Sequence, residues 1–152
     1  MTSIRISKEF KFETSHILND YDGLCCNIHG HSYRLLVTVS GTPIADPKDP
    51  KNGMVMDFGD LKSIVYHDIV AKYDHSLIVN DNSPEDVKEA MQKSTGRVLF
   101  TPYQPTCENM VAEFARIIRD QLPTHIKLCR VRLYETSTSY AEWFSTDNTH
   151  EN

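Results

Sequence analysis

HGHSYRLLVTV, residues 29–39, is the stretch that decides the fold. Its odd positions are histidine or apolar and its even positions are mostly small or polar, which is the period-2 pattern of a half-buried β-strand. The same alternation runs over residues 4–12, and His16 shares its inward parity if that strand continues unbroken. The sequence therefore predicts two strands whose inward faces carry His16, His29 and His31.

Helical spacing of apolar residues follows over residues 58–73, with Asp57 as a good N-cap, and the pattern stops at Asp74-His75. A second helix is predicted from Ser83, as its N-cap, to Gly96. A third is predicted from Thr106, also an N-cap, to about Leu122. These helices separate the first two strands from the remaining ones.

Strands return near the end of the sequence, where residues 130–135 alternate and residues 140–144 form a hairpin partner. The order predicts an α+β fold: an antiparallel four-stranded sheet with helices on one face. A chain of 152 residues is expected to be a single domain, 1–152. Within it, residues 83–103 are interpreted as an inserted segment and the polar residues 145–152 as a frayed tail.

Composition excludes several classes of protein. The net charge of −5 and the lack of a Lys/Arg cluster argue against nucleic-acid or anionic-membrane binding. No apolar run approaches the roughly 20 residues that cross a bilayer, and no apolar signal region follows Met1, so a cytoplasmic protein is expected. The cysteines are then expected to be reduced thiols: Cys25, Cys26, Cys107 and Cys129.

The strongest chemical signal is the set of three inward histidines. Two histidines at i and i+2 project to one face of a strand, and His16 on a neighbouring strand completes a trio. Three imidazoles with an open position form a catalytic zinc arrangement, although iron, nickel and copper also accept imidazole. Spacing alone leaves open the alternative that these are ordinary buried histidines satisfied by hydrogen bonds.

Three further positions are ambiguous from the residues alone. Cys25, like Cys26, is a packed side chain, a zinc ligand or a thiolate made reactive by a nearby metal. Asp74-His75 is a helix end favoured by the helix dipole or a proton-transfer dyad. Glu135 continues an inward strand face, where a carboxylate needs a ligand or a cationic partner unless it already lies at the sheet edge.

Six segments occur in one order along the chain: FKFETSH (10–16), Cys25 with HGH (29–31), MDFGDLK (56–62), Asp74-His75, PTCEN (105–109) and YET (134–136). Each is weak alone, but together they resemble the 6-pyruvoyltetrahydropterin synthase superfamily over roughly residues 4–144. The resemblance implies a tunnelling fold, in which the sheets of several subunits join into a barrel. It also implies a homohexamer with active sites at subunit interfaces.

The resemblance assigns roles residue by residue. The implied zinc ligands are His16, His29 and His31. The implied catalytic residues are Cys25 and the assisting dyad of Asp74 and His75. Glu135 matches the carboxylate that anchors the pterin ring, and Thr106 looks like part of the pterin pocket.

Three residues separate Cys25 from the HGH unit, which looks like the bacterial branch, the 6-carboxy-5,6,7,8-tetrahydropterin synthases. That branch implies conversion of 7,8-dihydroneopterin triphosphate to 6-carboxytetrahydropterin, acetaldehyde and triphosphate in queuosine (7-deazapurine) biosynthesis. A 6-pyruvoyltetrahydropterin synthase and a non-catalytic zinc and pterin-binding subunit stay open as alternatives. The doubled cysteine at Cys26 and the segment 83–103 depart from the family pattern.

Positive contacts for the triphosphate are left open by the sequence. The cations considered are Arg5, Lys8, Lys11 and Arg34, together with residues of a neighbouring subunit.

Overall fold

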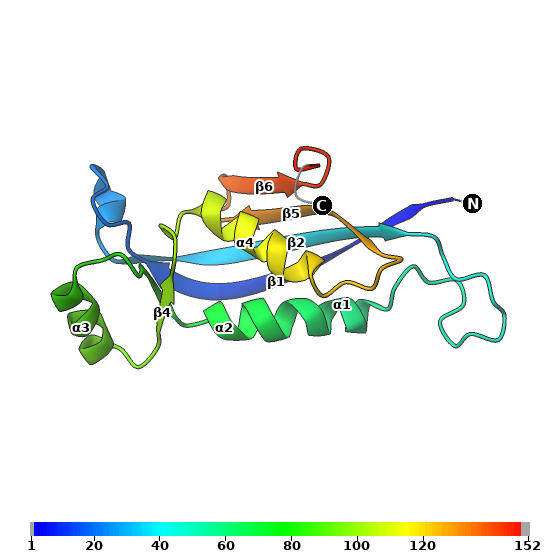
Figure 1. Cartoon of the computed structure of the whole chain (residues 1–152), viewed down its shortest axis with the longest axis horizontal. Helices are drawn as coiled ribbons and strands as arrows, with labels where there is room; N and C mark the ends of the chain where they lie inside the picture. Colours follow the sequence, from blue (N-terminus) through cyan, green and yellow to red (C-terminus); the bar gives the residue numbers. More distant parts are fainter. Residues whose placement is uncertain (1, 150–152) are drawn as a thin grey trace.

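The computed structural model describes residues 2–149. Its frame is a long antiparallel hairpin of β1 (Ile4–His16) and β2 (His29–Gly41), which runs along the molecule (Figure 1). Buried and exposed side chains alternate along both strands, and Phe12 stacks on Tyr33 with ring centroids 5.4 Å apart. The two predicted N-terminal strands are confirmed.

Four further strands complete the sheet in the described part of the chain. β2 pairs with β5 (Lys127–Tyr134), and β5 pairs with β6 (Tyr140–Phe144), both antiparallel. On the other edge, β3 (Leu77–Asn80) and β4 (Val98–Thr101) add in parallel beside β1. The order is β4-β3-β1-β2-β5-β6, so the predicted four-stranded antiparallel sheet is wrong in strand number and direction.

The sequence hides β3 and β4 because each has only four residues, too few to show a period. Leu77, Ile78 and Val79 are all buried, so β3 does not alternate. β4 lies inside the segment 83–103 that the sequence presents as an insertion. This segment therefore extends the sheet.

The first predicted helix is confirmed. α1 (Phe58–Val65), the π-helical turn η2 (Tyr66–Val70) and α2 (Ala71–Tyr73) follow one another without a break. Asp57 is its N-cap as predicted, since its Oδ1 accepts a hydrogen bond from the Gly59 N–H at 2.6 Å.

The third predicted helix is α4 (Cys107–Arg119). Thr106 caps it as predicted, because its Oγ1 accepts from the Asn109 N–H at 3.3 Å. The helix ends before the predicted Leu122, whose N–H bonds back to Ile118 at 3.2 Å within a closing turn. A turn of this kind at a helix end is not visible in apolar spacing.

The second predicted helix, α3 (Glu85–Ser94), forms with a different start. Pro84 takes the N-cap position, and the Ser83 hydroxyl donates to the Asn80 carbonyl at 2.6 Å. Ser83 as N-cap is therefore wrong. With β4, α3 lies at the end of the molecule where β1 ends and β2 begins (Figure 1).

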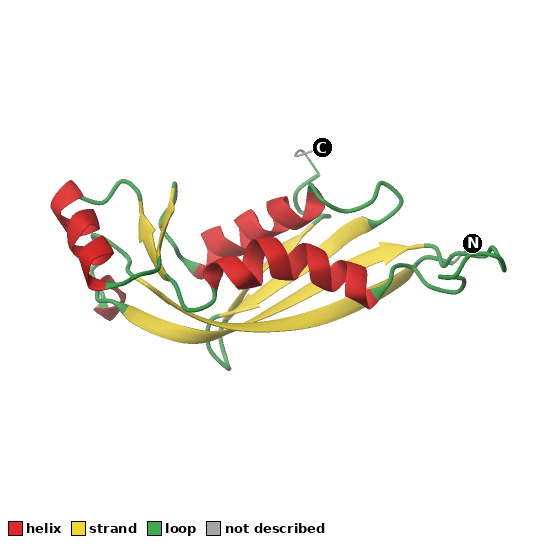
Figure 2. Ribbon diagram, turned by 90° about the horizontal axis from the view of Figure 1, so that it is seen from below, coloured by secondary structure: helices red, strands yellow, loops and turns green. Residues whose placement is uncertain are grey.

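α1, α2 and α4 cover one face of the sheet and leave the other face free of them (Figure 2). The core between them is formed by fully buried side chains, among them Leu35, Val37, Val131, Leu133, Leu61, Val65, Ile69, Met110, Phe114 and Ile118. Burying each such side chain stabilises the fold by about 1.5–3 kcal/mol. Phe58, which shares the predicted helical spacing, is an exception because it is half exposed.

Residues 145–149 turn back on the sheet: the Ser145 N–H donates to Cys129 O at 3.1 Å and the Asn148 Nδ2 donates to Phe144 O at 2.8 Å. The last residues of the predicted frayed tail, 150–152, lie outside the described residues. Among the helices that the structure describes, none combines the length and apolar character needed to cross a membrane.

Candidate functional site

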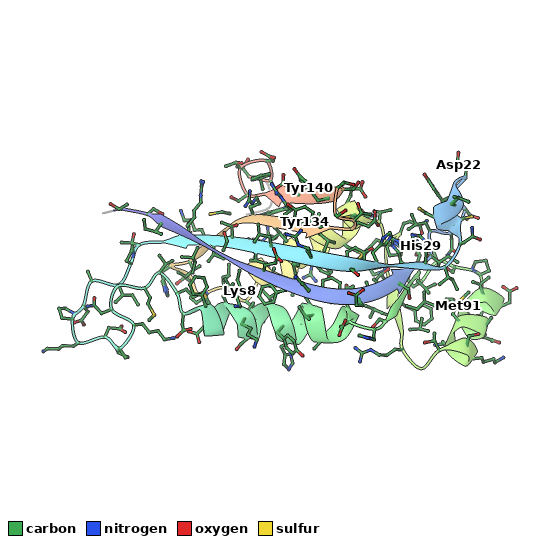
Figure 3. The ribbon with its side chains drawn as sticks, turned by 180° about the vertical axis from the view of Figure 1, so that it is seen from behind. Lys8, Asp22, His29, Met91, Tyr134 and Tyr140 are labelled. Atoms are coloured by element: carbon green, nitrogen blue, oxygen red, sulfur yellow. The ribbon has the colours of Figure 1, made fainter. Side chains whose placement is uncertain are left out.

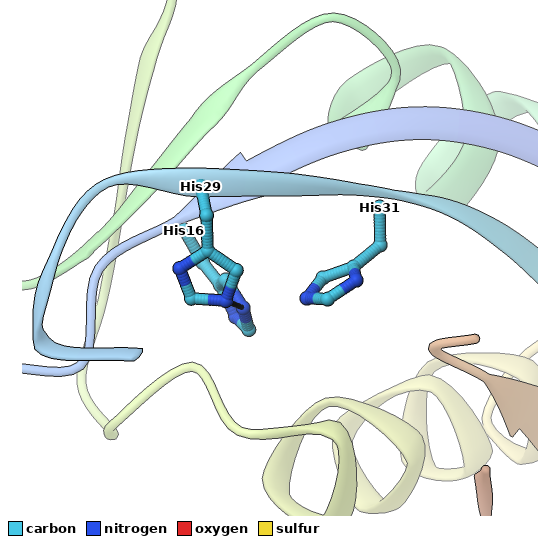
Figure 4. A group of neighbouring side chains, drawn as sticks. All are labelled: His16, His29 and His31. Carbon is cyan, nitrogen blue, oxygen red and sulfur yellow. Dashed lines mark hydrogen bonds between the residues drawn. The ribbon is translucent and has the colours of Figure 1, made fainter. Parts of the chain in front are cut away.

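The register of the hairpin brings the three histidines together. His16 stands opposite His29 in the β1–β2 pairing, and His31 stands opposite Thr14 on the same face. The three rings point toward one another on the side of α4 (Figure 4). Nε2 of His16 lies 2.9 Å from Nε2 of His29, and one nitrogen from each ring lies within 4.8 Å of the others.

Backbone carbonyls fix the orientation of two rings. Nδ1 of His16 lies 2.7 Å from the Pro105 carbonyl oxygen, and Nδ1 of His29 lies 2.8 Å from that of Asn27. A carbonyl only accepts, so each Nδ1 carries the proton and each neutral ring presents a lone pair on Nε2. Two facing lone pairs 2.9 Å apart are stabilised by a cation that both can bind, either a proton or a metal ion. This is the outer-shell pattern of metal-binding histidines.

His31 supplies the third nitrogen. Its Nε2 is buried and has no hydrogen-bond partner among the described residues. Three imidazole nitrogens at about 2.0–2.1 Å from one ion lie about 3.3 Å apart, which small side-chain adjustments of this trio would reach. The donor set therefore fits a metal ion held by three imidazoles with one position open.

Burial also favours the neutral form of two of the three rings. It lowers the pKa of His16, against an opposing hydrogen bond to Pro105, and it lowers the pKa of His31. A lowered pKa keeps an imidazole neutral at neutral pH, which is the form that binds a metal. His16 is only 1% exposed, so it is held in that form most firmly.

Glu135 lies beside the trio, directly after the end of β5. Its Oε1 is 3.6 Å from Nε2 of His31 and 3.7 Å from Nε2 of His16, and it accepts a hydrogen bond from the Tyr33 hydroxyl at 3.4 Å. The sequence left open whether Glu135 is an inward carboxylate with a partner or a residue at the end of its strand. In the structure it is both.

Sequence reasoning placed Tyr33 in the core and missed its hydroxyl at the site. Burial and the adjacent Glu135 carboxylate raise the pKa of Tyr33, so it stays a phenol that donates. The sequence signal for this role is that Tyr33 lies two residues after His31 and therefore on the same face of the strand.

Cys25 lies in the short 3-10 turn η1 (Leu24–Cys26) between β1 and β2. It is half-buried, whereas Cys26 is exposed. The loop that carries both cysteines ends at His29, the first residue of β2.

Cys107 is enclosed in the core instead. Its Sγ donates to the Leu133 carbonyl at 3.2 Å, and burial raises its pKa to about 12. A thiol in such surroundings is inert, so Cys107 is not a candidate for chemistry.

Thr106 lies next to Pro105, whose carbonyl holds His16. Its side chain is engaged in capping α4. Its backbone is engaged as well, since its N–H donates to the Gln104 carbonyl at 2.8 Å and its carbonyl accepts from the Met110 N–H at 3.0 Å.

Asp74 and His75 form a close pair. Nδ1 of His75 lies 3.0 Å from Oδ2 of Asp74, and the His75 side chain is 77% exposed. Asp74 Oδ1 accepts from the Glu13 N–H at 2.8 Å. Among the described residues, no hydrogen bond, ion pair or ring contact joins this pair to His16, His29 or His31.

A cavity of about 550 Å³ adjoins His75. Its lining includes Glu13, Ser15 and Ser32, which alternate with the buried side chains, and also His31 of the trio. α3 contributes Met91 to it (Figure 3). The cavity is mixed in character, with apolar walls and hydroxyl, carboxylate and imidazole groups.

The cations considered for a triphosphate do not contact the trio. Arg34 forms an ion pair with Glu9 at 3.0 Å and lies 4.6 Å from the ring centroid of Tyr134. Tyr134 is beside Tyr140 on the free face of the sheet (Figure 3). Arg34 is thus committed to neighbours within its own sheet.

Comparison with known proteins gives one consistent family. Residues 5–145 match the family described as 6-pyruvoyl tetrahydropterin synthase. The chain is 37% identical over 143 residues to 6-carboxy-5,6,7,8-tetrahydropterin synthase of Haemophilus influenzae, covering 91% of this chain and 97% of that protein. It is 29% identical to the protein of the same name from Aquifex aeolicus, covering 91% and 96%.

Solved structures agree in fold. An uncharacterised protein from Wolinella succinogenes superposes with a TM-score of 0.72 at 17% identity, covering 95% of this chain and 99% of that one. The 6-pyruvoyl tetrahydropterin synthase of Caenorhabditis elegans superposes with a TM-score of 0.67 at 23% identity, covering 95% and 96%.

Proposed function

The chain belongs to the 6-pyruvoyl tetrahydropterin synthase family, and from that premise we propose that it is a zinc-dependent 6-carboxy-5,6,7,8-tetrahydropterin synthase. It converts 7,8-dihydroneopterin triphosphate and water to 6-carboxytetrahydropterin, acetaldehyde and triphosphate, a lyase reaction of queuosine biosynthesis. The observation that carries the proposal is Glu135 beside a convergent histidine trio with one side open. The names of the bacterial relatives support the choice of reaction.

Zinc is the ion that we assign to His16, His29 and His31, because neutral imidazoles in a three-ligand set suit it. When bound, zinc polarises the oxygens of the substrate side chain as a Lewis acid. The protein holds the ligand rings in position through the carbonyls of Pro105 and Asn27.

Glu135 binds the ring of the substrate. A pterin presents neighbouring N–H donors on its pyrimidine edge, and a carboxylate accepts two parallel hydrogen bonds. The Tyr33 hydroxyl, which donates to Glu135 at 3.4 Å, steadies the carboxylate. Thr106, next to the Pro105 that holds His16, is the residue that we assign to the wall of this part of the pocket.

Cys25, as thiolate, removes a proton from the substrate side chain, and His75, oriented by Asp74, returns one. The exposed His75 ring, which has no hydrogen bond to the trio among the described residues, supports an arrangement in which a neighbouring subunit supplies the dyad. A homohexamer of this chain is the assembly that we propose.

The test is to incubate the zinc-loaded protein with 7,8-dihydroneopterin triphosphate and to analyse the pterin by mass spectrometry, with an acetaldehyde assay. We expect 6-carboxytetrahydropterin and an equal amount of acetaldehyde. A 6-pyruvoyl product without acetaldehyde would instead assign triphosphate elimination. Bound but unchanged substrate would make the protein a non-catalytic pterin-binding subunit.

A further inference from the structure

The turn that carries Asp74 and His75 has an unusual backbone. His75 has φ +57°, in the left-handed region that residues other than glycine rarely adopt. Such a conformation persists only when the surrounding structure holds it in place. The contacts on both sides of the turn therefore decide where the dyad points.

On one side, the turn is bonded to β1. The His75 N–H donates to the Glu13 carbonyl at 2.6 Å, and the Glu13 N–H donates to Asp74 Oδ1 at 2.8 Å. The Ser76 carbonyl accepts from the Ser15 N–H at 2.9 Å. These bonds fix the backbone of the turn against the sheet.

On the other side, one side chain holds the turn. Arg97, between α3 and β4, donates from Nη2 to the carbonyls of Ala71 at 2.6 Å and Lys72 at 3.1 Å, and from Nε to the Ser76 hydroxyl at 3.3 Å. The first two are carbonyls at the end of α2, which lack partners within the helix. A guanidinium suits this place because its donors form a rigid fork and its charge complements the helix dipole.

The main chain adds a further link, since the Leu77 N–H donates to the Arg97 carbonyl at 2.9 Å. Arg97 thus joins the helix that precedes the dyad, the serine that follows it and the start of β3. Both flanks of Asp74 and His75 are tied to this one residue.

We propose that Arg97 is a positioning residue for the Asp74–His75 dyad, so that the segment 83–103 contributes to catalysis through the orientation of these two side chains. The proposal rests on the proposed function for the part that His75 plays in turnover. Arg97 itself touches neither the metal site nor the substrate, and it acts through the turn.

The electrostatics of Asp74 agree with this geometry. The charged groups around its carboxylate are His75, Arg97 and Glu13. Burial acts to raise the pKa of Asp74, but the Glu13 N–H, the His75 ring and the Arg97 charge outweigh it and hold that pKa below its usual value. Removal of Arg97 is therefore expected to raise the pKa of Asp74.

The first experiment compares the kinetics of zinc-loaded variants. Arg97→Ala is expected to lower kcat by about 10- to 100-fold with little change in KM, because a misoriented proton donor slows chemistry more than binding. Arg97→Lys, which keeps a charge and some donors, is expected to recover part of the loss. The matched control is Arg116→Ala, which removes an arginine paired with Glu113 and Asp120 on the exposed side of α4.

A second experiment needs no substrate. Titration of the Asp74 carboxyl by carbon NMR is expected to give a higher pKa in Arg97→Ala than in the unaltered protein and Arg116→Ala, with zinc content unchanged. An unmoved Asp74 titration, or a kcat loss no larger than that of Arg116→Ala, would overturn the proposal. If Arg97→Ala does not fold, the same comparison is made with Arg97→Gln, which keeps donors but removes the charge, and an unchanged kcat and titration in that variant would overturn the proposal.

The two experiments separate this proposal from the proposed function. If the unaltered protein shows no turnover, the proposed function fails, while the Asp74 titration still decides whether Arg97 holds the dyad.

Discussion

The positions of the ring nitrogens of the three histidines indicate a metal site. The Nδ1 atoms of His16 and His29 face carbonyls, their Nε2 atoms face each other at 2.9 Å, and the buried Nε2 of His31 has no hydrogen-bond partner among the described residues. Ordinary buried histidines would be satisfied by hydrogen bonds, whereas these bring three ring nitrogens within 4.8 Å of one another without satisfying all of them. A metal ion bound by all three nitrogens would satisfy them together.

Substitution of His31 is the most direct test of the metal-ligand assignment. His31→Ala is expected to lose most bound zinc, because two imidazoles without the third leave an incomplete site. The control is His75→Ala, which removes a histidine of the same chain outside the trio and is expected to keep its zinc. Metal content after dialysis, measured by inductively coupled plasma mass spectrometry, decides the matter, and full occupancy in His31→Ala would exclude it as a ligand.

The sequence predicts the roles of some of these residues better than those of others. Parity on two long strands identifies His16, His29 and His31, because a period of two fixes the face of each side chain. The same parity includes Tyr33, but an aromatic side chain on an inward face is indistinguishable from core. The contact between Asp74 and Glu13 joins residues 61 positions apart and is not visible in any local pattern.

At the scale of elements, the start of helix α4 helps to hold one ligand of the proposed metal site in place. Its N-cap, Thr106, directly follows Pro105, whose carbonyl orients His16. The helix start and the ring of His16 are therefore fixed by adjacent residues, and a change in the cap acts on both.

Thr106→Ala is expected to reduce the free energy of unfolding by about 1 kcal/mol, since the Asn109 N–H loses its capping acceptor. Thr106→Ser keeps a hydroxyl in the same place and serves as the control, with a loss of only a few tenths of that amount. Urea unfolding of the two variants, followed by circular dichroism, measures the difference. Equal stability of Thr106→Ala and the unaltered protein would show that the cap contributes nothing.

Elements differ in how well the sequence reveals them. β1 and β2 have 13 residues each, long enough for alternation to be unmistakable, and Asp57 and Thr106 mark helix starts by their own chemistry. β3 and β4 have four residues each and form only through pairing with β1 and with each other. Their position depends on contacts between distant segments, which local periodicity does not report.

At the scale of the whole molecule, the two groups of candidate catalytic residues are not bonded to each other in the part of the chain that the structure describes. The trio and Glu135 lie between the sheet and α4, whereas His75 is 77% exposed and lines the cavity with Glu13 and Ser32, which His31 also lines. In the homohexamer that we propose, a complete site combines the trio of one subunit with the dyad of another, as a closed ring of identical subunits can provide.

Mixing two inactive variants tests this arrangement. His31→Ala disables the trio and His75→Ala disables the dyad, so each alone is expected to be nearly inactive. When equal amounts are co-expressed and assemble at random, about one quarter of the sites combine an intact trio with an intact dyad from different subunits. Turnover near a quarter of that of the unaltered protein is therefore expected. If trio and dyad of one subunit acted together, every mixed site would carry one defect and the mixture would stay inactive.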